Sequence, residues 1–149
     1  MQITDWIFDL DGTLYTPLEH VWEITLLHMR RYFIETLGLP ITLSLEEQEL
    51  IKAKWQTTQT TVAYCNEFQL DFDALVSATH LPILNHIVVA PRLGAETIQH
   101  LPGKKWVLTN SPEKFAHAML RHINLDIFDG VFGIRDDQQN AKPNPKSFQ

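Results

Sequence analysis

The sequence contains a single cysteine, Cys65, so no disulfide can form within the chain. Such scarcity is typical of a reducing compartment, and we expect a cytoplasmic protein in which Cys65 is packed rather than reactive. No apolar run approaches the roughly 20 residues of a membrane helix. The N-terminus, with Asp5, also lacks the basic and apolar pattern of a signal peptide. These absences predict a soluble protein with no membrane partner.

Positive charge is also scarce, with 12 Lys and Arg against 18 Asp and Glu and a net charge of −6. This balance argues against nucleic acid as a general partner, because phosphate backbones attract basic surfaces. A small phosphorylated ligand stays compatible with it, provided that positive charge is concentrated locally. The seven histidines show no HExxH or similar metal-binding spacing.

Three short apolar segments predict the strands of an α/β fold. Thr4–Leu10 contains consecutive apolar residues and predicts a strand buried on both faces. Further strands are expected at Trp106–Thr109 and around Val131–Ile134. Helices are expected between these strands, one over about 91–101 and one that starts at Ser111, with Ser111 as its N-cap. Strands that alternate with helices in this order predict parallel pairing with right-handed crossovers.

The segment from about residue 16 to residue 88 is predicted to be almost entirely helical. Capping patterns mark the expected helix starts, and Gly38 is expected to follow the end of the first helix. These starts are Thr16-Pro17 with Glu19, Ser44 with Glu47, Thr60 or Thr61, and Asp71 or Asp73. We therefore predict an α/β core made of residues 1–15 and 89–149, with a helical cap, residues 16–88, inserted after the first strand.

Polar residues follow the first two predicted strands. Asp9 and Asp11 end the first strand, and Thr109 and Asn110 end the second. Ligands bind beyond the carboxyl ends of parallel strands, so these residues are expected to face one cleft, which Lys142 can also reach. Taken alone, Asp11-Gly12 is an ordinary turn pair and Lys142 an ordinary surface lysine; their combination and order favour a functional site.

This combination suggests phosphoryl transfer. One carboxylate can attack phosphorus, and a second can protonate the leaving oxygen and then activate water. Carboxylates and phosphate repel one another, so a divalent cation is required, and oxygen ligands suit Mg²⁺. Thr109 and Lys142 can hold phosphate oxygens, and Gly12 lets the backbone approach them closely.

The segments DLDGTLY, LTNS and AKPNP, in this order, resemble the first three motifs of the haloacid dehalogenase superfamily. The resemblance implies that Asp9 is the nucleophile and a metal ligand. It implies that Asp11 is the general acid/base, with its backbone carbonyl also on the metal. Thr109 and Lys142 would anchor the phosphate, with Asn110 beside Thr109 in the phosphate loop.

Within the superfamily, an acid two positions after the nucleophile is the pattern of phosphatases rather than dehalogenases. The predicted insert resembles the C1-type cap, and the DGTLY segment is most similar to the pyrimidine 5′-nucleotidase-like branch, which often has asparagine where this chain has Gly12. The resemblance thus implies a Mg²⁺-dependent phosphatase acting on small phosphomonoesters such as nucleoside 5′-monophosphates. A sugar phosphomutase of the same superfamily is an alternative.

The superfamily's fourth motif, an acidic pair on a further strand, should follow Lys142 by a few tens of residues. The sequence ends at Gln149, seven residues after Lys142, and Asp136 and Asp137 precede it in the wrong order. We therefore expect a core that lacks its C-terminal strands, weak Mg²⁺ binding and slow turnover. An incomplete or non-catalytic domain is a second alternative, and the uncovered edge of the first strand predicts self-association.

Overall fold

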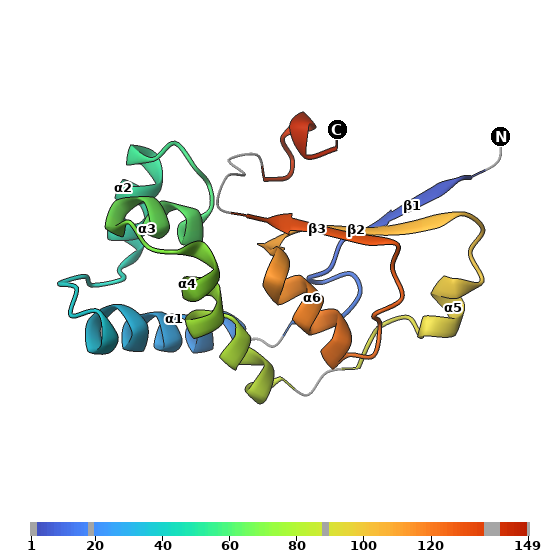
Figure 1. Cartoon of the computed structure of the whole chain (residues 1–149), viewed down its shortest axis with the longest axis horizontal. Coiled ribbons are helices and arrows are strands. Elements are labelled where there is room, and N and C mark those ends of the chain that lie inside the picture. The colour runs from blue at the N-terminus through green and yellow to red at the C-terminus, as the bar shows by residue number, and fades with distance from the viewer. Residues whose placement is uncertain (1–2, 18–19, 88–89, 136–140, 149) are drawn as a thin grey trace. The chain divides into compact units, whose positions relative to one another are not determined.

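The computed structural model describes residues 3–17, 20–87, 90–135 and 141–148, which divide into two compact units. Unit 1 comprises Met1–Glu19 and His86–Ile134, and unit 2 comprises His20–Asn85 and Arg135–Gln149. Figure 1 labels the elements of both. Residues 135–149 thus group with the helical segment by contact, and the predicted division into a core and a cap stays a prediction.

Unit 1 is built on a parallel sheet of three strands, which confirms the predicted α/β fold. The strands β1 (Asp5–Phe8), β2 (Lys104–Pro112) and β3 (Gly130–Ile134) lie in the order β1-β2-β3. Both pairings are parallel, with Phe8 opposite Val107 and Val107 opposite Val131. The carboxyl ends of the strands consequently meet at one edge of the sheet.

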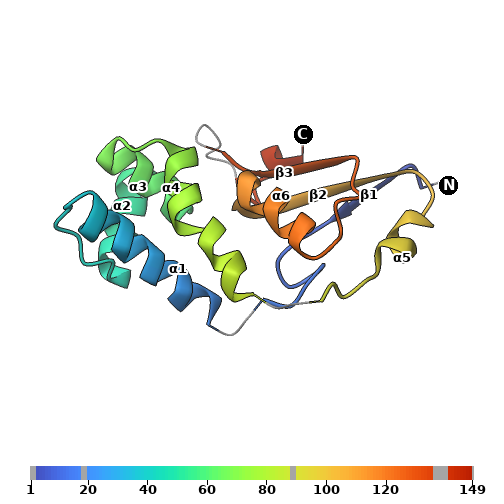
Figure 2. The same ribbon diagram turned by 60° about the horizontal axis from the view of Figure 1, so that its bottom comes forward.

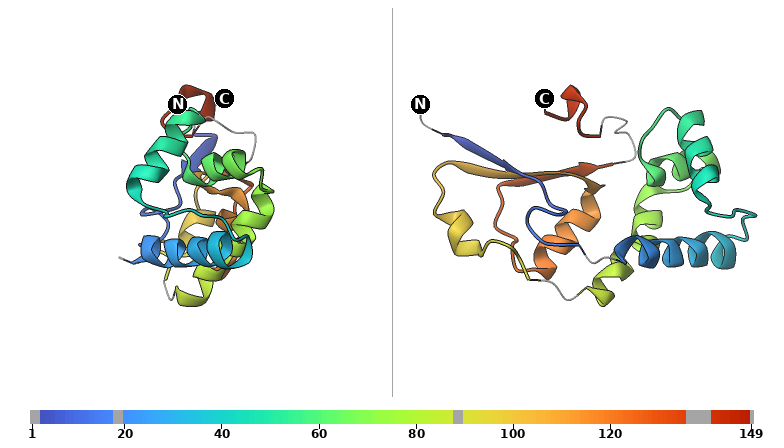
Figure 3. Two further views of the ribbon diagram at one scale, coloured as in Figure 1. Left: turned by 90° about the vertical axis from the view of Figure 1, so that its left-hand side faces the viewer. Right: turned by 180° about the vertical axis from the view of Figure 1, so that it is seen from behind.

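Two helices of unit 1, α5 (Ala95–Gln99) and α6 (Glu113–His122), lie on the same side of this sheet (Figure 1, Figure 3). The apolar residues of α6 recur at helical spacing and are buried, namely Phe115, Ala116, Met119 and Leu120. Val107 in β2 is also fully buried. Fully burying a Phe, Met, Leu or Val side chain contributes about 1.5–3 kcal/mol.

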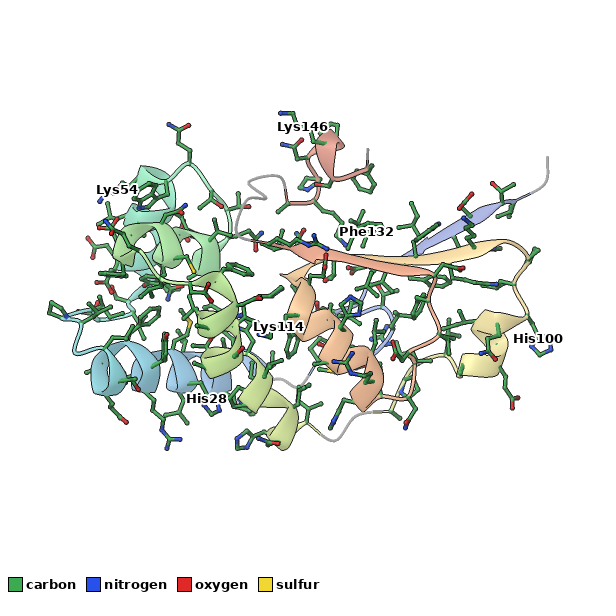
Figure 4. The ribbon with its side chains drawn as sticks, in the orientation of Figure 1. His28, Lys54, His100, Lys114, Phe132 and Lys146 are labelled. Carbon is green, nitrogen blue, oxygen red and sulfur yellow. The ribbon has the colours of Figure 1, made fainter. Side chains whose placement is uncertain are left out.

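The prediction that the first strand is buried on both faces is wrong. Ile7 in β1 is 61% exposed and Phe132 in β3 is 50% exposed, whereas their neighbours along each strand are more buried. Phe132 points away from α6 (Figure 4). The reason is that, among the described residues of unit 1, both helices lie on one side of the sheet, so side chains alternate between covered and exposed positions.

Unit 2 contains the helices α1 (Val21–Arg30), α2 (Leu45–Lys54), α3 (Thr60–Phe68) and α4 (Phe72–Thr79), with a π-helix at Arg31–Thr36 (Figure 2). The predicted starts of the last three helices are confirmed. Ser44 accepts a hydrogen bond from the backbone N–H of Glu47, and Asp71 accepts one from Ala74. A further 3-10 turn covers Leu81–His86, and another covers Pro145–Phe148.

The start predicted for the first helix at Thr16 is wrong, because α1 begins at Val21. Thr16 does not cap this helix; its hydroxyl accepts a hydrogen bond from Nε of Arg92, at 3.0 Å. Glu19, the other half of the predicted capping box, lies outside the described residues. Gly38 follows the helical segment with φ +65°, as expected for a residue after a helix end.

The helix predicted over residues 91–101 is also shorter than expected, since α5 comprises only Ala95–Gln99. Pro91 forms an isolated antiparallel bridge with Tyr15, and the backbone N–H of Arg92 donates to the carbonyl of Leu14 at 2.8 Å. These long-range pairings hold the start of the segment in an extended conformation.

Cys65 is buried in α3, as predicted. It lies in a helix whose Tyr64 and Phe68 rings stack beside Phe33. Within the described part of the chain, no helix combines the length and the apolar character needed to cross a bilayer.

Candidate active site

The candidate site begins where β1 ends. Asp9 follows the strand, Leu10 is fully buried, and the chain then turns, with the N–H groups of Thr13 and Leu14 donating to the Leu10 carbonyl. Gly12 has φ +80°, and an alanine Cβ there would meet no atom within 4 Å. Backbone conformation, rather than crowding, therefore favours glycine at this turn.

The turn brings the carboxylate of Asp11 against three hydroxyl groups. The Tyr15 hydroxyl donates to Oδ1 of Asp11. Oδ2 accepts from Oγ1 of Thr109 at 3.2 Å and from Oγ of Ser111 at 2.7 Å. Hydrogen bonds to both oxygens fix the direction of this carboxylate, and two of the donors come from the neighbouring strand β2.

Tyr15 is almost completely buried, with 1% of its surface exposed. Burial raises the pKa of its phenol, and the negative charge of Asp11, its hydrogen bond to Asp11 and the charge of Asp9 raise the pKa further. The phenol therefore stays neutral and donates a hydrogen bond to Asp11. The negative charges of Asp9 and Asp11 thus both act on the Tyr15 phenol.

Thr109 and Ser111 are held together at the carboxyl end of β2. Thr109 is 3% exposed, and its Oγ1 accepts a hydrogen bond from the backbone N–H of Ser111 at 3.0 Å. The adjacent strand approaches closely, because a Cβ on Gly133 would lie 2.7 Å from the Ser111 carbonyl oxygen. This glycine permits the contact that supports the position of Ser111.

The prediction that Ser111 caps the following helix is wrong. The N-cap of α6 is Pro112, with no side-chain capping bond, and the hydroxyl of Ser111 is directed to Asp11 instead. A charged acceptor gives a stronger hydrogen bond than a neutral one, which favours this choice once the fold has brought Asp11 near.

The structure thus joins two of the predicted site residues, Asp11 and Thr109, and adds two that the sequence did not predict for the site, Tyr15 and Ser111. Tyr15 lies four residues after Asp11 in DGTLY. The turn between them brings the Tyr15 hydroxyl into contact with the Asp11 carboxylate. Asn110 is exposed, and Gly12 occupies the turn. Lys142 belongs to unit 2, so its convergence with Asp9 stays a prediction, as do the functional roles of all these residues.

The donor set at the end of β1 fits the chemistry of Mg²⁺. Carboxylate and carbonyl oxygens of Asp9 and Asp11 are hard ligands, and Mg²⁺ is commonly bound by one or two carboxylates together with water and phosphate oxygens. No group of three or more acidic, histidine or cysteine side chains suited to a metal occurs in the described portion of the chain. Both oxygens of the Asp11 carboxylate already accept hydrogen bonds from hydroxyls, and the metal-binding roles of Asp9 and Asp11 stay predictions.

The arrangement can support transfer of a phosphoryl group. A half-buried carboxylate, Asp9, lies at the strand end, and a second, Asp11, is oriented by hydroxyls that can also donate to an anion. A nucleophile, a positioned acid/base and hydroxyl donors are the groups that such a reaction requires.

Solved structures of similar fold were found by comparison. CbbY from Rhodobacter sphaeroides, in complex with phosphate, superposes with a TM-score of 0.62 at 18% identity, covering 99% of this chain and 70% of that one. A putative β-phosphoglucomutase from Thermotoga maritima gives 0.51 at 20% identity, covering 98% and 68%. The putative HAD-hydrolase YfnB from Bacillus subtilis, bound to magnesium, gives 0.50 at 17% identity, covering 99% and 72%. These likenesses show the fold.

No curated protein gave a significant sequence match. The sequence profile of haloacid dehalogenase-like hydrolases, in contrast, matches residues 7–149, which include the turn of Asp9 and Asp11 and the end of β2. The chain therefore belongs to the haloacid dehalogenase-like hydrolase family.

Proposed function

We propose that this chain hydrolyses small phosphomonoesters, with nucleoside 5′-monophosphates as the substrate class, through an aspartyl-phosphate on Asp9. The observation that carries the proposal is the hydrogen bond from Thr109 to Asp11. It joins the ends of two adjacent parallel strands and brings together the two sequence segments that resemble the first and second motifs of the family.

In the proposed reaction, a carboxylate oxygen of Asp9 attacks phosphorus and the bond to the ester oxygen breaks. Asp11, protonated in the substrate complex, gives this proton to the leaving oxygen. Water then attacks the phosphorus of the aspartyl-phosphate and loses a proton to Asp11, which releases inorganic phosphate and restores both side chains.

The phosphate oxygens would be held by the hydroxyl of Thr109 and the ammonium of Lys142, with Asn110 and the Gly12 turn beside them. Bound Mg²⁺, on Asp9 and the Asp11 carbonyl, would offset the repulsion between carboxylate and phosphate. Support for Mg²⁺ comes from the oxygen donors of this chain, and a structural neighbour, YfnB, carries magnesium.

The substrate class is inferred from the similarity of DGTLY to the pyrimidine 5′-nucleotidase-like branch and from the proposal that residues 16–88 form a C1-type cap. Among the structural neighbours, CbbY was solved with phosphate and, as a variant, with xylulose-1,5-bisphosphate. Sugar phosphates therefore belong in the substrate panel beside the nucleotides.

The test is phosphate release by the purified chain with Mg²⁺ from nucleoside monophosphates and sugar phosphates. We expect turnover that Asp9→Asn reduces by about a thousandfold or more, since it removes the nucleophile. Asp126→Asn is the matched control, because Asp126 is an exposed aspartate of unit 1 outside the site. Equal rates for wild type and Asp9→Asn would refute the assignment.

Two other outcomes identify the alternatives. Interconversion of sugar-phosphate isomers without phosphate release would indicate a phosphomutase. Binding of inorganic phosphate without turnover of any substrate, with or without Mg²⁺, would indicate a non-catalytic domain.

A further inference from the structure

The buried hydroxyl of Tyr15 has no role in the reaction proposed above. The turn after β1 returns the chain so that residue 15 forms an isolated bridge with Asp11, and a second bridge joins Tyr15 to Pro91. Its ring is thus fixed by backbone pairing on both sides and by burial. A tyrosine held in this way directs its hydroxyl in one direction, toward Asp11.

The donors on Asp11 divide between its two oxygens. Among the described residues, Tyr15 alone donates to Oδ1, whereas Thr109 and Ser111 both donate to Oδ2. The two groups also differ in origin. Tyr15 lies on the same turn as Asp11, and the other two lie on β2, where a phosphate is expected to bind.

A hydroxyl has a single proton to donate. While Thr109 and Ser111 donate to Asp11, neither can donate to a phosphate oxygen. Binding of phosphate by Thr109 therefore requires its proton to turn away from Oδ2. When the donors from β2 leave, Asp11 keeps the hydrogen bond from Tyr15 on the opposite oxygen.

We propose that Tyr15 is a positioning residue for phosphoryl transfer: it holds Oδ1 of Asp11 while the hydroxyls of Thr109 and Ser111 turn from Oδ2 to the phosphate. This inference rests on the proposed function. It explains why one oxygen of the acid/base has a donor that does not come from β2, and it leaves Oδ2 available for proton transfer to the leaving oxygen.

The test uses Tyr15→Phe, which removes the hydroxyl and keeps the buried ring. Tyr64→Phe is the matched control, because Tyr64 is also fully buried but its hydroxyl has no hydrogen-bond partner among the described residues. With p-nitrophenyl phosphate and Mg²⁺, we expect Tyr15→Phe to lower kcat by about ten- to a hundredfold, the order of loss caused by a misplaced catalytic group. KM should change by less than about twofold, because this hydroxyl does not touch the substrate. Tyr64→Phe should leave both constants at their wild-type values.

A second readout needs no turnover. The thermal midpoint of the metal-free chain is compared for Tyr15→Phe, Asp11→Ala and the double variant. We expect Tyr15→Phe to lower the midpoint of the wild type but to leave unchanged or raise that of Asp11→Ala, where the phenol has lost its acceptor.

The outcomes separate this inference from the proposed function. A wild-type chain without turnover would refute the proposed function, and the positioning role with it. An active wild type with an unchanged kcat in Tyr15→Phe, or with a loss confined to KM, would overturn the positioning role alone. Additive effects on the thermal midpoints would show that the Tyr15–Asp11 contact does not form and would also overturn it.

Discussion

A partly buried histidine should make the stability of the helical unit depend on pH. His80 follows α4, and burial lowers the pKa of its imidazole from 6.5 to about 4. The hydroxyl of Thr79 donates its proton to the Leu75 carbonyl at 2.7 Å and lies 2.8 Å from Nδ1 of His80. Because that hydroxyl has no second proton, Nδ1 is the donor between them in this arrangement.

The sign and size of the effect follow from linkage. The folded state binds this proton less tightly than the unfolded state does, so the stability contribution is present above pH 6.5 and is lost as the pH falls toward about 4. A shift of this size corresponds to about 3 kcal/mol in total. Between pH 7.5 and pH 5 the free energy of unfolding should fall by about 2 kcal/mol from this group alone.

The assay is urea denaturation of wild type and His80→Gln at these two pH values. We expect the wild type to lose about 2 kcal/mol more than the variant, because glutamine has no proton to gain. His100→Gln is the control, since His100 is exposed at the end of α5 (Figure 4), and it should keep the wild-type pH dependence. Identical pH dependence in His80→Gln and wild type would refute the assignment of the effect to His80.

Three further predictions test the fold and the site. Gly133→Ala should lower the free energy of unfolding by about 1–3 kcal/mol and reduce phosphate release, because its Cβ would lie 2.7 Å from the Ser111 carbonyl oxygen; wild-type stability and turnover would contradict this. Asp71→Ala should cost about 1 kcal/mol in urea denaturation, since it removes the cap of α4, and an unchanged midpoint would argue against that cap. The chain should self-associate through β1, so that sedimentation velocity shows an average mass that rises with concentration. Ile7→Lys should suppress this rise and Leu45→Lys, at an exposed position of α2, should not, whereas equal behaviour of the two variants would exclude β1 as the contact.

Much of the fold could be predicted because its signals are local. The apolar runs of the three strands stop at turn residues, and connections through helices force parallel pairing, as observed. Ser44 and Asp71 cap their helices through bonds to backbone groups three residues away. A bond of that span is determined by the order of residues and needs no knowledge of the remaining chain.

The errors occurred where the conformation or burial of a residue depends on a distant segment. Thr16 bonds to Arg92 instead of starting a helix, and Ile7 is exposed because no described helix of unit 1 covers its side of the sheet. In both cases, the local pattern permits two outcomes. The choice between them depends on a segment tens of residues away.

In the candidate site, too, one part of the arrangement follows from the sequence and another part only from the tertiary structure. By itself, the sequence determined that Asp9, Asp11 and Thr109 stand near the carboxyl ends of adjacent parallel strands, because hydrophobic runs and chain order specify which edge these strands share. The strand β2 itself continues past the predicted end at Thr109 to Pro112. Only the tertiary structure decided that Ser111 bonds to Asp11 rather than to its own helix, and that Tyr15 turns its hydroxyl to the same carboxylate. A hydroxyl donates one proton and can reach several acceptors, so its partner is selected by the three-dimensional position of the charged group and not by sequence spacing.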